Sequence, residues 1–185
     1  MKYAKMLGLL AVAAAALMAF AGTASATVTY NGSAYTETIE ATSTDSRLDG
    51  SVDVACGHST IACSITGGAT EATISSLTFT ECGSDTVNII NKGSLKISST
   101  GTVTSVDAEV TVQLHRTVFG FPVTTHCIYA TGKAGTNVGT LEEGTDKIIL
   151  SGTKIPQVST DSGCGSNAQW TGTYTISKPG ALTID

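Results

Sequence analysis

Apolar and polar side chains alternate along much of the chain beyond residue 26. Between 169 and 177, Trp170, Gly172, Tyr174 and Ile176 alternate with threonine and serine. A period of two gives a strand one apolar face and one face of hydroxyl groups. The same alternation occurs within 94–99 and 108–117. The pattern therefore predicts half-buried antiparallel strands.

Short strands of this kind are expected throughout that region, near residues 28–30, 35–41, 51–56, 60–66, 72–80, 85–91, 94–99, 108–117, 127–131, 146–153, 169–177 and 181–184. Glycines mark the turns between them, and Asn31-Gly32 is a signal for a two-residue hairpin. The connections are too short for the crossover helices that parallel strands need. The sequence thus predicts an all-β fold: a single antiparallel β-sandwich of the Ig-like or Greek-key type, with a Greek-key barrel as the alternative.

The first 26 residues have the three parts of a secretory signal peptide. Lys2 and Lys5 form the positive region, residues 7–21 the apolar region, and residues 24–26 the small-x-small cleavage signal. We expect cleavage after Ala26, an amino-terminal arm or first hairpin over 27–45, and the sandwich domain over 46–185. We expect no transmembrane segment in the mature chain. The protein should be exported, to the periplasm, the cell surface or the extracellular space.

The mature chain is poor in charge and slightly acidic. Charged residues make up 14% of the 185-residue chain, against about 25% in ordinary domains. Without Lys2 and Lys5, the chain has 8 basic and 15 acidic residues and a net charge of −7. Nucleic-acid binding needs a basic patch, and the one adjacent pair of cationic residue types in this sequence is His115-Arg116. We expect no nucleic-acid partner.

All five cysteines lie in the predicted mature chain, and an oxidising compartment allows them to form disulfides. An odd number leaves at least one thiol without a partner in the chain. The spacing favours bonds between Cys56 and Cys82 and between Cys127 and Cys164, with Cys63 free. The alternative joins Cys63 to Cys82 and leaves Cys56 free.

Familiar patterns of catalytic or metal-binding residues do not occur in this sequence. Cys56, His58 and Cys63 lack a common zinc spacing. The segments 125–127 and 161–164 superficially resemble the His and Ser segments of chymotrypsin-like proteases, but they lie too close together in the chain for that fold. We expect no catalytic residues, no metal and no cofactor.

Aromatic side chains are few, and their positions determine whether a binding platform is available. Trp170 alternates with core positions, so we expect it to be buried. Phe119 and Phe121 flank Gly120 and precede Pro122, which is typical of a loop or a strand end. These two phenylalanines either form an apolar contact loop or fold back over the end of the sandwich.

The chain combines four cysteines with a strand motif, a glycine and a tryptophan. These are Cys56, the run 74–82 that ends in Cys82, Gly101, Cys127, Cys164 and Trp170. This combination resembles a group of small exported bacterial β-proteins, most of them uncharacterised. The group is distantly similar to the alkane-oxidation-activator type of surface protein, which is linked to the biofilm matrix. The resemblance implies a place at the cell surface.

The mature chain is also similar to chaperone-assembled pilins, which are exported all-β proteins whose amino-terminal arm completes a neighbour's sheet. Residues 27–41 would form such an arm. The carboxyl end, residues 181–185, lacks the penultimate aromatic residue that is usual in pilins.

These observations predict a non-catalytic exported protein of the cell surface or extracellular matrix that assembles by β-strand exchange. Its expected partners are further copies of itself or cell-surface components. The alternative is a secreted module that binds a polysaccharide or a small apolar molecule, which would need exposed aromatic residues or a sizeable apolar pocket.

Overall fold

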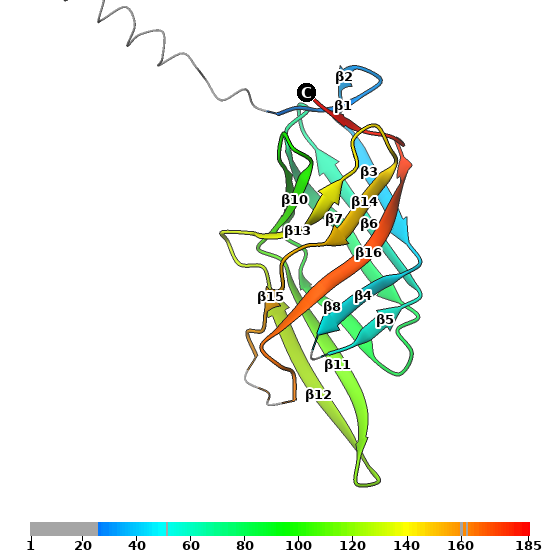
Figure 1. Cartoon of the computed structure of the whole chain (residues 1–185), viewed down its shortest axis with the longest axis vertical. Helices are drawn as coiled ribbons and strands as arrows, with labels where there is room; N and C mark the ends of the chain where they lie inside the picture. The colour runs from blue at the N-terminus through cyan, green and yellow to red at the C-terminus, as the bar shows by residue number, and fades with distance from the viewer. Residues whose placement is uncertain (1–25, 51, 160, 162) are drawn as a thin grey trace, which may run out of the picture.

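A computed structural model describes residues 26–50, 52–159, 161 and 163–185, so the predicted signal peptide lies outside the described residues except for Ala26. Every regular element in these ranges is a β-strand (Figure 1). The strands are β1 Val28–Tyr30, β2 Ser33–Ala34, β3 Thr38–Ser43, β4 Ser46–Gly50, β5 Val54–Cys56, β6 His58–Ile65, β7 Glu71–Thr80, β8 Thr86–Asn91, β9 Ser94–Ile97, β10 Thr102–Val106, β11 Glu109–Val118, β12 Phe121–Ala130, β13 Thr136–Leu141, β14 Lys147–Ser151, β15 Ile155–Pro156, β16 Asn167–Lys178 and β17 Thr183–Ile184. The described ranges contain no helix of the length and apolar character that a membrane crossing requires.

Eight strands close into a barrel, in the order β14-β13-β10-β9-β7-β6-β3-β16. The circle is completed where β14 pairs with β16, from Lys147 opposite Thr175 to Ser151 opposite Thr171. All of these pairings are antiparallel. The all-β prediction is therefore confirmed, whereas the predicted sandwich is wrong.

The closure depends on β16, which is long enough to serve several neighbours. Its first half pairs with β4 through residues 168–171, and its second half pairs with β3 from Thr175 onward. Gly172 lies between these two pairings with a φ of 148°, and a Cβ at this position would stand 3.2 Å from the Cα of Ser46. Glycine is suited to such a close backbone approach. The sheet is joined to itself because β16 pairs with β3 on one edge and with β14 on the other, so that Thr175 lies opposite both Thr42 and Lys147.

The amino-terminal segment is paired within the chain. β1 and β2 form a hairpin across Asn31-Gly32, whose φ angles of 52° and 72° fit the predicted two-residue turn. β1 also pairs with β17 at one end of the barrel (Figure 1). β3 is one of the strands of the barrel wall, where it pairs with β6 and β16. The segment expected as an arm or first hairpin is therefore a hairpin followed by a barrel strand.

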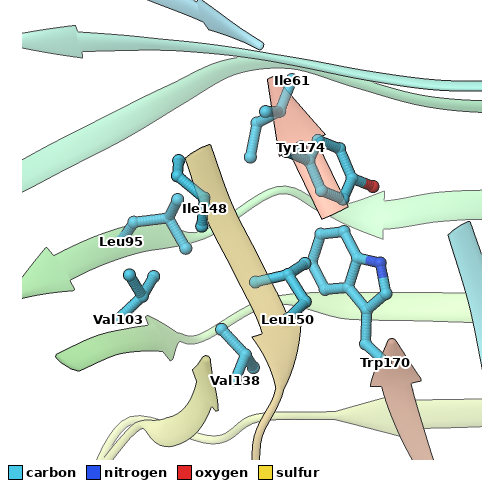
Figure 2. A pocket seen from close by; sticks show the side chains of 8 residues that line it. All are labelled: Ile61, Leu95, Val103, Val138, Ile148, Leu150, Trp170 and Tyr174. Carbon is cyan, nitrogen blue, oxygen red and sulfur yellow. The ribbon is translucent and has the colours of Figure 1, made fainter. Parts of the chain in front are cut away.

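The barrel interior is filled by apolar side chains. Figure 2 shows Leu150, Trp170, Tyr174 and their neighbours around an internal cavity of about 20 Å³. A second cavity, of about 30 Å³, lies between Trp170 and Tyr129. Each has room for a water molecule or two but not for a sugar or a small apolar ligand.

A chain of hydrogen bonds crosses this interior. The Trp170 Nε1–H donates to Ser46 Oγ at 3.1 Å, and Ser59 Oγ donates to the Thr78 carbonyl at 2.9 Å. The Tyr174 hydroxyl lies between them, 3.2 Å from Ser46 Oγ and 2.6 Å from Ser59 Oγ. Since both ends have fixed directions, Ser46 donates to Tyr174 and Tyr174 donates to Ser59. Desolvation raises the pKa of Tyr174, which keeps its hydroxyl proton in place.

Candidate functional site

The most prominent surface feature is the hairpin of β11 and β12, which projects beyond the body of the protein (Figure 1). Its strands pair without a break from Glu109 opposite Ala130 to Val118 opposite Phe121. Phe119 and Gly120 form the two-residue turn, with φ angles of 52° and 83°. Positive φ at both central residues is the type I′ geometry that suits the twist of a hairpin. The segment expected as a loop or strand end is therefore the tip of a long regular hairpin.

One face of this hairpin belongs to the core at its base and stands in solvent at its tip. Directly opposite residues share a face, so Val112 and Cys127 at the base lie on the same face as Val118 and Phe121 at the tip. Val112 and Cys127 are fully buried. The tip residues are exposed, with Phe119 97% and Phe121 72% accessible. Neither phenylalanine folds back over the body.

Val118 and Val123 extend the apolar surface around the two phenylalanines, and both are exposed. Sequence reasoning identified Phe119 and Phe121 but not these valines. Val118 lies on the same face as Val112 and Leu114, but Arg116 interrupts the apolar alternation between them, so the sequence pattern gave no clear signal for it. We define the hairpin tip as residues 117–123.

The hairpin is fixed at two levels, next to the tip on β11 and at its base on β12. Asp85, which is 9% exposed, accepts hydrogen bonds from the His115 amide and from the Arg116 guanidinium, each at 2.8 Å on Oδ1. On the other strand, Cys127 is bonded to Cys164, and the Tyr129 hydroxyl donates to the Cys164 carbonyl at 2.6 Å. The tip is thus carried on a stem with a defined direction.

The outer edge of β12 is partly covered and partly blocked. Ile128 uses its outward-facing groups: its carbonyl accepts from the Val158 amide at 2.8 Å and its amide donates to Ser159 Oγ at 3.1 Å. Outward-facing positions recur at every second residue, so Thr124 and Pro122 face the same edge. Pro122 has no amide hydrogen to offer there. A proline at such a position discourages the pairing of another strand.

The disulfides in the structure join Cys56 to Cys82 and Cys127 to Cys164. Cys63 is free and buried. Its side chain lies on the inward face of β6, and burial raises the pKa of its thiol to about 12. The alternative bond between Cys63 and Cys82 does not occur.

The remaining residues considered from the sequence do not gather into a ligand site. Trp170 is 7% exposed and packs edge-to-face against Phe79 and Tyr174, so it belongs to the core. Cys127–Cys164 brings the segments 125–127 and 161–164 together, but Ser162 lies outside the described residues. In the described ranges, no three residues among His, Cys, Asp and Glu are placed to hold a metal ion.

Searches of protein-family models, curated proteins and solved structures found no match to this chain.

Proposed function

We propose that this protein is a non-catalytic exported protein of the cell surface or extracellular matrix, and that the β11–β12 hairpin is its contact element. The observation that carries the proposal is the exposure of Phe119 and Phe121 at the end of a projecting hairpin (Figure 1). Exposed clusters of large apolar side chains mark sites of interaction on soluble domains. The two disulfides support export, because such bonds persist in oxidising compartments. The resemblance to small exported surface proteins leads to the same location.

Contact through side chains fits this geometry better than strand exchange. Residues 28–30 and 38–43 are already paired within the chain, and each strand of the closed barrel pairs with another barrel strand on both edges. The edge of β12 at the tip is interrupted by Pro122. A partner is therefore expected to meet the apolar side chains of the tip rather than a free backbone edge.

The test compares the full chain with the double variant Phe119→Ser/Phe121→Ser, each produced in the source organism. The matched control is Val158→Ser, because Val158 is 55% exposed but does not belong to the tip. Cytoplasmic, surface-associated and released fractions are quantified by immunoblotting. We expect the wild type and the control on the surface or in the matrix, and the double variant in the medium. Retention of the wild type in the cytoplasm would overturn export, and equal attachment of all three would overturn the role of the hairpin.

A further inference from the structure

The polarity of the hairpin is graded along its length. The tip, residues 117–123, contains no charged residue. The first charged side chain towards the body is that of Arg116, with His115 beside it. Arg116 lies opposite Val123, so the uncharged part of the hairpin ends at the row of Thr117 and Pro122. Strands rise by about 3.3 Å per residue, so this part is about 7 Å deep. Amphipathic helices that lie in a lipid interface bury their apolar face to a depth of about 5–10 Å, which is the depth that an apolar hairpin tip would have to match.

The charge nearest to the tip is directed away from it. Arg116 Nη1 bonds to Asp85 Oδ1 at 2.8 Å and to Oδ2 at 2.9 Å. Asp85 immediately precedes β8, whose first residue Thr86 pairs with Gln113, so this carboxylate lies on the body side of Arg116. The guanidinium is therefore held towards the body, and the turn with the two rows beyond Arg116 can leave water without taking a charge with it. Moving a charge into an apolar medium would be costly.

The backbone of the tip also lacks one donor that would otherwise lose water. Val118 and Phe121 face each other as the closing pair of a two-residue turn and bond to one another. Pro122 occupies the next outward-facing position of β12 and has no amide hydrogen. Unsatisfied backbone donors are the main obstacle to placing a strand in a lipid environment. The missing donor lowers that obstacle where the apolar side chains are most exposed.

From these three observations we infer that the hairpin tip inserts into the interface of a lipid bilayer. Phe119 and Phe121 enter the boundary between headgroups and acyl chains. The side chains of His115 and Arg116 remain at the level of the headgroups. This inference rests on the proposed contact role of the hairpin and names the partner. The match is in apolar depth rather than in net charge, because Asp85 neutralises Arg116 and the mature chain is acidic. Electrically neutral phosphatidylcholine is therefore a sufficient target.

The experiment uses the disulfide-bonded mature chain and vesicles of pure phosphatidylcholine, with a second set that contains phosphatidylglycerol. Co-sedimentation measures the partition of the wild type, of Phe119→Ser/Phe121→Ser and of the control Val158→Ser. A further variant, Phe119→Trp, reports insertion through its fluorescence, since Trp170 is buried and supplies a constant background. Circular dichroism verifies that each variant is folded, which is expected because all substituted side chains are exposed.

We expect the wild type and Val158→Ser to partition equally onto both kinds of vesicle, and the double variant to partition at least tenfold less. The emission of Phe119→Trp should shift to shorter wavelength when vesicles are added. Failure of the wild type to bind phosphatidylcholine, while attachment to cells still requires the two phenylalanines, would overturn the lipid inference and leave the proposed function intact. Binding to anionic vesicles alone would overturn it. Tip-dependent self-association without vesicles would assign the tip to a second copy of the chain instead.

Discussion

Asp85 and Arg116 form an ion pair of 2.8 Å in which the carboxylate is nearly buried and the guanidinium is half-exposed. The same carboxylate oxygen accepts a hydrogen bond from the His115 amide, so a single side chain holds both the backbone and the charge next to the hairpin tip. We expect Asp85→Asn to reduce the free energy of unfolding by about 1–3 kcal/mol, since hydrogen bonds to a charged group are lost. Urea denaturation measures the loss, and amide hydrogen exchange should show faster exchange in 114–118.

Asp53 supplies the matched control for that substitution. Its carboxylate lies 2.8 Å from Arg47, the same distance as in the Asp85 pair, but it is 70% exposed. Exposed ion pairs are screened by water and contribute little. Asp53→Asn should leave the denaturation midpoint unchanged. Equal effects of the two substitutions would contradict the role assigned to Asp85.

The buried hydroxyl chain predicts the effect of removing Ser46. Ser46→Ala leaves the Trp170 Nε1–H without its acceptor and removes one hydrogen bond from Tyr174. A buried donor without a partner costs about 1–3 kcal/mol, and the loss should be visible in urea unfolding followed by Trp170 fluorescence. Ser75→Ala is the control, because the Ser75 hydroxyl bonds to the Ala62 carbonyl in an exposed position. A smaller loss of unfolding free energy for Ser46→Ala than for Ser75→Ala would refute the buried chain of hydrogen bonds.

The Cys63 thiol should be almost inert in the native protein. With its pKa raised from 9.0 to about 12, the thiolate fraction at pH 8 is about a thousandfold lower than that of an unshifted thiol. We expect no labelling by Ellman's reagent in the native state and one equivalent after denaturation. Rapid native labelling would show that Cys63 is accessible.

The same shift makes folding depend on pH. Because the folded pKa lies above the unfolded one, the neutral thiol is favoured by folding, and its contribution is complete below pH 9. That contribution is lost as the pH rises from 9 towards 12, by about 1.4 kcal/mol per pH unit. The midpoint temperature of thermal unfolding should therefore fall more steeply between pH 8 and 10 for the wild type than for Cys63→Ala. Parallel curves would contradict the shift.

The two disulfides should differ in their susceptibility to reduction. Cys127 and Cys164 are both fully buried, whereas Cys82 is only partly buried. A mild phosphine reductant should open Cys56–Cys82 first, as peptide mapping after alkylation would show. Removing either bond by paired alanine substitutions should cost about 3–4 kcal/mol in the chain-entropy model, given sequence separations of 26 and 37. First reduction of Cys127–Cys164 would be the contrary result.

Pro122 is predicted to keep the edge of β12 from pairing with another chain. Pro122→Thr restores an outward amide and should increase self-association, as measured by sedimentation velocity. Val123→Thr is the control, because the Val123 amide faces β11 rather than the outer edge. An unchanged sedimentation profile for Pro122→Thr would mean that the proline does not protect this edge.

Strands whose side chains alternate strongly could be predicted from the sequence, and their partners could not. The region 169–177 was expected as one strand and is the centre of β16. Its pairing with β14, which closes the barrel, follows from contacts distant in the sequence that a period of two does not encode. β10 and β13 were missed because threonine, serine and glycine interrupt their apolar positions.

The hairpin shows the same limit at the candidate site. Phe121 and Pro122 were expected in a loop or at a strand end, and they begin the ten-residue strand β12, which was expected only over 127–131. Proline normally argues against a strand, and it is tolerated here because its position faces an unpaired edge. Which edge Pro122 faces depends on the register of β11 and β12. The sequence alone could therefore indicate Phe119 and Phe121 as contact residues, but not the direction in which the hairpin presents them.

The pairing of β1 with β17 gives the molecule a polarity that can be used in practice. Both strands lie at the pole of the barrel opposite the hairpin (Figure 1). A dye, bead or carrier domain attached near Thr27 or Asp185 would stand at the far pole and leave Phe119 unobstructed. An array of molecules immobilised through either strand would therefore present a uniform layer of phenylalanine tips.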